Sequence, residues 1–422
     1  MNGTMKLAAP LVAALAIAAC SSGGSSSIPR ADTSQTVGSA SRQIPEWQAK
    51  GLARAVCPQV VGRPSCYALQ SLVVPAGCNP TAACGFTATD LETAYNLTPL
   101  LGNGSGTKVA VVEAGDEAQA ATDLATYRTQ YGLGTASFFK YNENGQQSNY
   151  PPPCSDYGWC VETALDIEMV SASCPKCTIY LMEATNGKTI ADFEQAEKEA
   201  VTLGATIVSN SWSCPNDWDC QDPNFGNFFN TKGVAYLAST GDSGYGVIGG
   251  PSALASVISV GGTQLHKSGS TFTESVWNGA GAGCADPAHV GSPGVPKPAW
   301  QTDKDCTYRT DGDVSAQAGV NPGVAIYISS YGGWGSVGGT SVASPLLAGV
   351  IALEGNAGSW NANGGQRFWA LSDKKVKHEL HYISKGSDGS CGGEYLCTAG
   401  TNQYETYSGP GGWGSPKGDK AF

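Results

Sequence analysis

A serine that follows a glycine pair is the first candidate for chemistry in this sequence. The stretch GGTSVASP places Ser341 just before the apolar run LLAGVIALEG. The run predicts a helix that begins beside Ser341, and the first N–H groups of a helix have no partner within it. Those groups, at the positive end of the helix dipole, can stabilise an oxyanion. The pattern favours a nucleophilic serine, although a serine that only caps a helix is the commoner case.

A nucleophilic serine needs a group that accepts its proton, and histidine is the usual one. The string Gly-Thr-Ser-x-x-x-Pro resembles the nucleophile region of subtilisin-like enzymes, whose histidine stands in a His-Gly-Thr helix start. This sequence has four histidines: His266, His289, His378 and His381. None of them precedes Gly-Thr, and all lie in polar or late segments. A Ser-His pair is therefore not favoured.

Carboxyl groups are the remaining candidates to accept the serine proton. Glu162 and Asp166 stand in WCVETALDIEMVSASC, a largely apolar stretch that predicts a helix over 159–174. On a helix their spacing of four places both side chains on one face. Asp242 stands in Gly-Asp-Ser-Gly, directly after the strand-like AYLAST. Taken alone, each motif also fits an ordinary solvated helix face or a turn.

Strand-like and helix-like segments alternate from Gly85 onward and must position these side chains. Apolar runs predict strands over 107–114, 178–184, 205–212, 233–240 and 256–263. Helical spacing predicts helices over 123–132, 159–174, 190–204 and 341–355. The alternation predicts an α/β fold with a mostly parallel sheet and helices on both faces. Catalytic groups in such folds gather outside the carboxyl ends of the strands.

The three catalytic strings, in this order, resemble those of the sedolisins, which are serine-carboxyl peptidases with a subtilisin-like fold. The resemblance covers roughly Gly85 to Gly418. It rests on ETALDIE, STGDSGYG and GGTSVASPLLAGV, with support from GFTATDLETAYNL, VVEAGDEAQAATDLATYRTQYGL, PKPAWQTD and GGWGSPKG. It implies a subtilisin-like, doubly wound α/β fold and a serine-carboxyl endopeptidase that hydrolyses polypeptides at acidic pH.

The resemblance also implies a role for each catalytic position. Ser341 is the nucleophile, and Glu162 is the general base and then the acid. Asp166 orients Glu162 by sharing a proton with it, and Asp242 is the protonated acid that donates to the oxyanion. A glutamate base, with a reference pKa of about 4.3, works in acid where histidine is fully protonated. No cofactor is required for this chemistry.

Two other interpretations stay open. A subtilisin-type peptidase with an unrecognised Ser-His pair would lose activity in acid, whereas a carboxyl enzyme gains it. An inactive surface-binding module on the same fold would hydrolyse nothing. Against the second stands the retention of all four catalytic positions, since a decayed enzyme usually loses at least one.

The resemblance implies a structural Ca²⁺ site near the C-terminus, built from two aspartates and several backbone carbonyls. Here the first aspartate position is Tyr382, before Ile383, and the second aligns with Ser408 or, with a different gap, Glu405. The expected flanking glycines are missing too. Because Ca²⁺ needs charged oxygen ligands, the sequence predicts a weak or absent site.

The first twenty residues, MNGTMKLAAPLVAALAIAAC, have the basic start, short apolar run and small-residue end of a signal peptide. Cys20 after Ile-Ala-Ala resembles a bacterial lipobox, whose cysteine becomes lipidated; a plain signal peptide cleaved nearby is the alternative. The sequence thus predicts an extracellular or cell-surface lipoprotein of a bacterium. Contact with a membrane is expected only through the lipid on Cys20.

Four segments are expected along the chain: a signal peptide with lipobox (1–20), a flexible tether (21–45), a short disulfide-stapled extension (46–84) and the peptidase domain (85–422). The tether is polar and poor in bulky apolar residues. Sedolisins commonly carry a long N-terminal prodomain, and here only about sixty residues separate Cys20 from Gly85. The stapled segment either serves in its place or stays attached.

Cysteine usage agrees with export. Of fifteen cysteines, fourteen remain without Cys20, and an even number suits an oxidising compartment. Neighbours along the chain are expected to pair: 57/66, 78/84, 154/160, 174/177, 214/220, 284/306 and 391/397. Cys174-Pro-Lys-Cys177 also fits a redox motif, but a structural staple is favoured.

The charge of the chain limits the classes of partner that it could bind. Only 14% of residues are charged, the net charge is −11 and the pI is about 4.8. No basic stripe exists to neutralise phosphates, which argues against nucleic acid, and the acidic balance suits a protein that stays folded in acid. We expect a monomer that acts on polypeptides.

Overall fold

The computed structural model describes Met1 and residues 44–73, 79, 81–156, 158–360 and 363–422. Apart from Met1, the expected signal peptide with Cys20 lies outside these residues, as do Cys78 and nearly all of the tether. Within the described part of the chain, no helix is both long and apolar enough to cross a membrane.

The core is a mostly parallel sheet with the strand order β12-β11-β9-β7-β4-β6-β5, and β15 pairs with β11. Its strands are β4 (Lys108–Ala114), β5 (Ser137–Asn142), β6 (Thr178–Ala184), β7 (Ile207–Asn210), β9 (Ala235–Ser239), β11 (Ile258–Ser268), β12 (Thr271–Val276) and β15 (Val314–Gln317). Only the β11–β12 pair in this sheet is antiparallel among the described strands. The predicted α/β fold with a mostly parallel sheet is confirmed.

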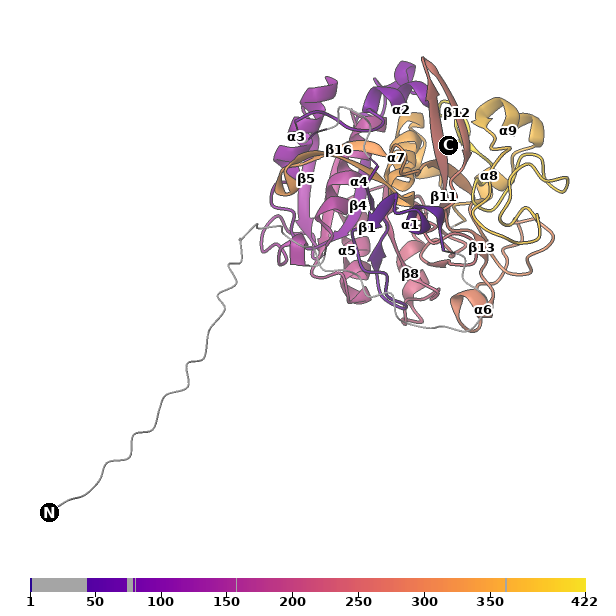
Figure 1. The fold of residues 1–422 in the computed structure, drawn as a ribbon, viewed down its shortest axis with the longest axis horizontal. Coiled ribbons are helices and arrows are strands. Elements are labelled where there is room, and N and C mark those ends of the chain that lie inside the picture. The colour runs from indigo at the N-terminus through magenta and orange to yellow at the C-terminus, as the bar shows by residue number, and fades with distance from the viewer. Residues whose placement is uncertain (2–43, 74–78, 80, 157, 361–362) are drawn as a thin grey trace. The chain divides into compact units, whose positions relative to one another are not determined.

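Helices cover the sheet because its strands are apolar on both faces. In β4 every residue after Lys108 is buried, and successive side chains of a strand point to opposite faces. The longer helices are α2 (Ala88–Ala94), α3 (Ala120–Tyr131), α4 (Cys160–Ser173), α5 (Ile190–Thr202) and α7 (Thr340–Glu354); the short ones are α1 (Glu46–Ala49), α6 (Pro287–Val290), α8 (Gln366–Trp369) and α9 (Asp373–Glu379). Helices α4 and α7 pack against each other and against the central strands (Figure 1).

Two strand predictions need correction. The run 205–212 is not one strand but ends as β7 at Asn210, and the chain restarts at Trp212 as β8 (Trp212–Pro215). The break at Ser211 turns the chain out of the large sheet, and this serine then hydrogen-bonds to residues of α4 and α7. The run 256–263 is only the first part of β11, which continues to Ser268 as one arm of a hairpin with β12.

The N-terminal extension is built into smaller sheets of the same compact unit as the rest of the described chain. It contributes α1 and the strands β1 (Ala53–Ala55), β2 (Ser65–Cys66) and β3 (Leu69–Ser71). Strand β2 pairs with β8, which also pairs with β10 (Gly249–Gly250). Strand β3 pairs with β1 and with β17 (Gly333–Gly338), whose other neighbour is β16 (Val324–Ile328). Two further ribbons are β13 (Gly283–Cys284) with β14 (Thr310–Asp311) and β18 (Leu380–His381) with β19 (Ser415–Pro416).

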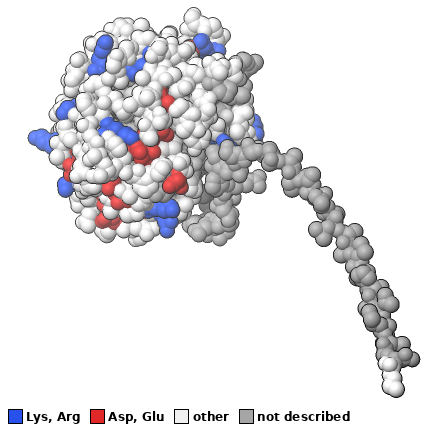
Figure 2. Space-filling model, turned by 90° about the vertical axis from the view of Figure 1, so that its left-hand side faces the viewer, with Lys and Arg blue, Asp and Glu red and all other residues white. Residues whose placement is uncertain are grey.

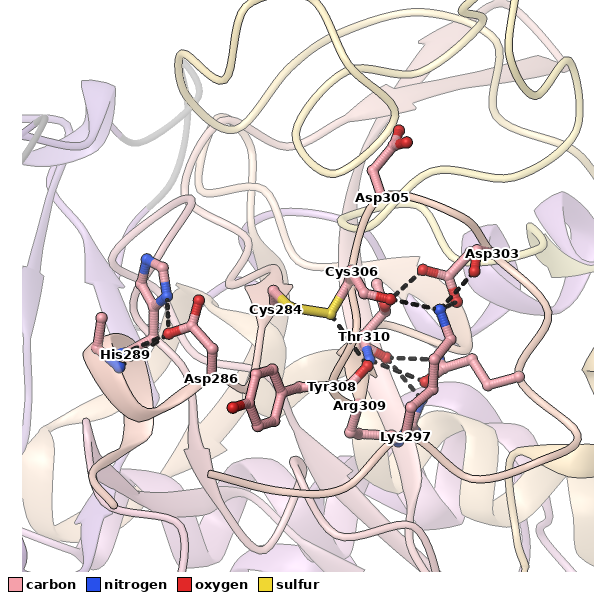
Figure 3. Close-up of a disulfide and its surroundings, with 12 residues drawn as sticks. Cys284, Asp286, His289, Lys297, Asp303, Asp305, Cys306, Tyr308, Arg309 and Thr310 are labelled. Atoms are coloured by element: carbon pink, nitrogen blue, oxygen red, sulfur yellow. Dashed lines mark hydrogen bonds and ion pairs between the residues drawn. A yellow bond between two sulfur atoms is a disulfide. The ribbon is translucent and has the colours of Figure 1, made fainter. Parts of the chain in front are cut away.

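Six of the seven expected disulfides are confirmed, and the seventh involves Cys78, which the structure does not describe. The bridge between Cys284 and Cys306 closes the loop that joins β13 to β14 (Figure 3). Inside this loop Lys297 forms an ion pair with Asp303, with 2.8 Å between Nζ and Oδ1. The bridge and the ion pair hold a long irregular connection in one conformation.

Surface charge is mixed on the face of the molecule in Figure 2, where Lys and Arg side chains alternate with Asp and Glu. No continuous basic stripe crosses the described residues on that face.

Candidate active site

The carboxyl ends of three neighbouring strands bring the candidate residues to one place. Strand β4 carries Glu113 next to its last residue, Ser211 follows β7, and Asp242 follows β9 by three residues. These strands are adjacent and parallel, so their ends meet at one edge of the sheet. Helices α4 and α7 both begin above this edge, with Glu162 in the first turn of α4 and Ser341 in the first turn of α7.

Ser211 links the two helices at the site. Its hydroxyl donates to Oδ1 of Asp166 at 2.8 Å and lies 3.3 Å from the carbonyl oxygen of Ser341. That carbonyl is available because Pro345, four residues later in α7, has no N–H to donate to it. The Ser341 hydroxyl in turn donates to the carbonyl oxygen of Ser211 at 3.2 Å. These hydrogen bonds fix Ser341 of α7 relative to Asp166 of α4.

Glu162 and Asp166 lie on one face of α4, as predicted, and both are completely buried. Burial and the nearby charge of Asp166 raise the pKa of Glu162 well above its usual value. The neighbouring Ser341 hydroxyl, which can turn to donate to the carboxylate, and the Ala68 N–H lower it in part. Burial raises the pKa of Asp166 to about 7, against hydrogen bonds that lower it. Because two buried neighbours cannot both ionise at low cost, the pair holds a proton in acid.

Glu113 is a third buried carboxyl at the site, and the sequence analysis missed it. Burial, followed by the charges of Asp166 and Glu162, raises its pKa well above the usual value. Hydrogen bonding between Glu113 and Asp166 contributes to the pKa of both groups, and such a bond requires that one carboxyl carries a proton. The signal was present in the sequence: a glutamate inside the apolar run VAVVEA is too costly to bury without a purpose or a partner.

Asp242 faces the first turn of α7. Its Oδ1 accepts hydrogen bonds from the backbone N–H of Thr340 at 2.8 Å and from the Thr340 hydroxyl at 2.9 Å. Burial raises the pKa of Asp242 to about 8, and the two bonds from Thr340 oppose the rise. The other oxygen, Oδ2, is buried with no hydrogen-bond partner among the described residues. A proton on Oδ2 in acid would give the site a neutral donor.

Gly339 lets the backbone pass close to this donor. Its φ of +102° belongs to a conformation that side-chain-bearing residues rarely adopt. A Cβ at this position would lie 2.0 Å from the carbonyl oxygen of Tyr67 and 2.6 Å from Oδ2 of Asp242. Glycine is therefore required both by the conformation and by the space.

The four histidines lie elsewhere in the described chain. His266 contacts Ser275 on the β11–β12 hairpin, and His289 contacts Asp286 at the start of α6 (Figure 3). His378 lies on α9 and His381 on β18. Among the hydrogen bonds of the described residues, none joins a histidine to Ser341.

The positions aligned with the sedolisin calcium ligands do not form a fitting donor set. Tyr382 is partly exposed, and the ammonium of Lys377 lies 5.6 Å from its ring centre. Ile383 packs in a small apolar cluster. The Glu405 carboxylate pairs with Lys377 at 2.8 Å, and the Ser408 hydroxyl accepts from the Gly411 N–H at 3.2 Å. A single carboxylate that is already paired does not suit Ca²⁺.

Among the described residues, Glu117, Cys154 and Cys160 form a cluster of side chains of metal-ligand type. The two cysteines are bonded to each other. A disulfide leaves no thiolate to bind a metal.

Comparisons with known proteins relate the chain to a family of peptidases. The model of the subtilase family (Peptidase_S8) matches residues 104–380. Sedolisin from Pseudomonas sp. (strain 101) is 26% identical over 367 residues, which are 78% of this chain and 60% of the relative. Subtilisin from Bacillus sp. (strain TA39) is 28% identical over 209 residues, which are 47% of this chain and 40% of that relative. The chain therefore spans about 60% or less of the curated relatives it matches.

Among solved structures, the fold is similar to that of Pseudomonas sedolisin, a serine-carboxyl proteinase complexed with two molecules of pseudo-iodotyrostatin. The TM-score is 0.65 at 24% identity, covering 80% of this chain and 97% of that one. This likeness concerns the fold, and together with the sequence similarity it supports the resemblance drawn from the motifs. The family model covers well over half of the chain, and the chain belongs to the subtilase family.

Proposed function

We propose that this protein is a serine-carboxyl endopeptidase that hydrolyses peptide bonds of polypeptides at acidic pH. The observation that carries the proposal is the buried carboxyl group Glu162, which lies beside the Ser341 hydroxyl where a subtilisin-type enzyme would need a histidine. The similarity to sedolisin supports the same assignment.

Each residue has one task in this mechanism. Glu162 takes the proton of Ser341 as the serine oxygen attacks the carbonyl carbon, and later gives a proton to the leaving nitrogen. Asp166, held by Ser211, shares a proton with Glu162 and so keeps it correctly oriented. Asp242, protonated, donates to the oxyanion, which forms at the positive end of the α7 dipole. Water then hydrolyses the acyl-enzyme by the same route.

Hydrolysis of a denatured protein at pH 3–6, after acid incubation of the full chain, tests the proposal. Ser341→Ala and Glu162→Gln should each lower kcat/KM by about 10³-fold or more, because loss of one member of such a triad leaves only residual catalysis. Both variants should keep the melting temperature of the parent at pH 4, where the buried carboxyls are protonated. Near-normal turnover of Glu162→Gln would show that the carboxyl group is not the base.

The same assay separates the two alternatives. An inactive surface-binding module would hydrolyse nothing at any pH. A Ser-His enzyme would work best near neutrality and would be insensitive to Glu162→Gln.

We also propose that the protein is exported and held at the cell surface by a lipid on Cys20. The support is the sequence around Cys20 and the number of disulfides. Labelling with a fatty-acid analogue should mark the parent chain and not the Cys20→Ser variant. Equal labelling of the two chains would contradict the anchor.

A further inference from the structure

A strand of the N-terminal extension crosses the candidate active site in the manner of a bound polypeptide. On one side, Ser65 and Cys66 pair antiparallel with Ser213 and Trp212 of β8. The Tyr67 N–H then donates to the carbonyl oxygen of Ser211 at 3.1 Å, the same oxygen that accepts from the Ser341 hydroxyl.

On the other side of Tyr67 the extension continues along β17, the strand that leads into α7. Leu69 pairs antiparallel with Gly338, and Gln70 with Val337. The extension is therefore held by backbone pairing before and after one peptide bond, Tyr67–Ala68. Backbone pairing of this kind is how an extended peptide adds to a sheet edge.

The two ends of the Tyr67–Ala68 peptide bond face the groups that would cleave it. The Tyr67 carbonyl oxygen and Oδ2 of Asp242 both lie within 2.6 Å of the point where Gly339 would carry a Cβ. The carbonyl oxygen and the candidate oxyanion donor are therefore close neighbours. The Ala68 N–H donates to Oε2 of Glu162 at 2.7 Å. The nitrogen that must leave therefore touches the group that would protonate it.

The Tyr67 side chain is also buried in the site. It is 2% exposed, its hydroxyl hydrogen-bonds to the hydroxyl of Ser213, and its ring covers Gly241, where a Cβ would lie 3.0 Å from the tyrosine oxygen. The backbone at Gly241 has a φ of +108°, a conformation suited to glycine, which leaves this space open for an aromatic ring.

We propose that the Tyr67–Ala68 bond is the first substrate of this chain: Ser341 cleaves it within the same molecule, and the cut opens the site to other polypeptides. The proposal rests on the proposed peptidase function. The Ser341 oxygen bonds to the Tyr67 carbonyl carbon and its proton passes to Glu162. The bond to the Ala68 nitrogen breaks as that nitrogen takes a proton from Glu162, and water then releases the Tyr67 carboxyl group and restores the serine.

Burial explains why the cut comes first and why it is intramolecular. Ser341, Glu162 and Ala68 have no exposed surface, so no outside polypeptide reaches the nucleophile while the strand is in place. For the same reason a second enzyme molecule cannot reach the Tyr67–Ala68 bond. The rate of the cut should then be independent of protein concentration.

The part upstream of the cut can leave. The described disulfide of this part, Cys57–Cys66, has both cysteines before Tyr67 and so does not tie it to the rest. Its other contacts are all noncovalent. Strand β1 pairs with β3 and β2 with β8, and Trp47, Leu52 and Ala53 pack in an apolar cluster with Trp277. Two further hydrogen bonds run from the Trp47 indole N–H to the Asp242 carbonyl oxygen at 2.8 Å and from the Glu46 N–H to Oδ1 of Asn278 at 2.8 Å.

The test starts from the full chain purified at neutral pH and shifted to pH 4. Intact mass and N-terminal sequencing should show one early cut, with Ala68 as the new N-terminus, at a first-order rate that does not change over a tenfold range of protein concentration. Hydrolysis of an added denatured protein should begin after a lag that matches this cut. A tagged Ser341→Ala chain should stay intact, both alone and mixed with the parent.

Two further measurements guard against a misfolded variant. Ala68→Pro removes the N–H that faces Glu162 and should slow the cut by about 100-fold; Val73→Pro, a matched change at an exposed position of the same segment, should not. Acid-incubated enzyme should cleave the linear peptide RPSSYALQSLV, residues 63–73 with serine for Cys66, between tyrosine and alanine.

Several outcomes would overturn the proposal and leave the peptidase function standing. These are hydrolysis of added protein by a chain that is still intact, a first cut at another bond, or a rate that rises with concentration. If the chain stays intact and inactive, Tyr67→Asp, which should displace the strand, decides between the two. If that variant hydrolyses added protein, the strand is an inhibitor and not a substrate. If it does not, the result counts against the peptidase function as well.

Discussion

The proton on Asp242 decides how the candidate site responds to pH at the scale of single residues. This carboxyl has a raised pKa, about 8 in the closed structure, because it is buried. Above its pKa it would place a negative charge where the oxyanion must form. In the closed structure the Glu162 and Asp166 pair gains a negative charge as pH rises through about 7, because burial raises the pKa of Asp166. Once the site is open to water, desolvation is weaker and the pKa values of all these carboxyls shift toward acid. In strong acid, Glu162 is protonated and cannot act as the base.

We therefore expect a bell-shaped dependence of kcat/KM with its optimum in acid, whose apparent pKa values belong to the coupled carboxyls. Asp242→Asn keeps a donor but cannot ionise, so it should lower kcat/KM by about 10²-fold or more and flatten the alkaline limb. Asp286→Asn, at the start of α6, is the control and should leave the profile unchanged. An optimum at or above neutrality in the parent would contradict the carboxyl mechanism.

At the scale of elements, the site depends on how closely α4 and α7 approach each other. Gly349 of α7 lies at their contact, where a Cβ would be 1.9 Å from the Ser173 hydroxyl oxygen and 3.3 Å from the Cys174 nitrogen. Any shift of one helix moves Glu162 and Asp166 relative to Ser341.

Gly349→Ala should therefore destabilise the protein and reduce its activity together. Alanine stabilises a helix by about 1 kcal/mol relative to glycine, but overpacking a buried contact costs about 1–3 kcal/mol. We expect a melting temperature lower by a few degrees and a lower kcat. Gly102→Ala, which has open space around its Cβ position, should change neither. A more stable and fully active Gly349→Ala chain would show that the helices can separate without harm.

In sedolisins a calcium ion is expected to stabilise the C-terminal segments that correspond to those around β18 and β19. In this protein, contacts between side chains stabilise these segments. The ion pair of Lys377 and Glu405 and the apolar contacts of Ile383 join these segments. We expect EDTA to change the melting temperature by less than one or two degrees at pH 5. A large drop that Ca²⁺ reverses would mean that other oxygen ligands bind the ion.

At the scale of the whole molecule, buried carboxyls make the folded state most stable at acidic pH. Burial raises the folded-state pKa values of many acids, among them Asp242 and Glu183 to about 8, Asp166 to about 7 and Asp311 to about 6. Each of these groups holds its proton more tightly folded than unfolded. Its contribution to stability is complete below about pH 4 and is lost as pH rises toward the folded pKa, by about 1.4 kcal/mol per pH unit.

The melting temperature of the Ser341→Ala chain, chosen to avoid self-digestion, should therefore fall steadily from pH 4 to pH 8. Glu197→Gln removes one completely buried acid with a raised pKa and should make the fall shallower. Calorimetry across this range checks both expectations. A melting temperature that is constant or rises with pH would contradict them.

Much of this molecule could be predicted from the sequence because its signals are local. Apolar runs located β4, β6 and β9, and helical spacing located α4 and α7 nearly to the residue. The strand break at Ser211 could not be predicted, since it depends on hydrogen bonds to α4 and α7. The path of residues 65–71 across the site was also beyond the sequence, because the partners that hold it at the site lie more than ninety residues away and are mostly backbone groups.

The six described disulfides also say something about how the chain is made. Each joins one cysteine to the next along the sequence, over 3 to 22 residues, and no bridge encloses or crosses another. A polypeptide that emerges N-terminus first therefore completes each of these pairs before the first cysteine of the following pair appears. An oxidant that joins cysteines in order of arrival makes the native set directly, without a later step of thiol–disulfide exchange to correct it.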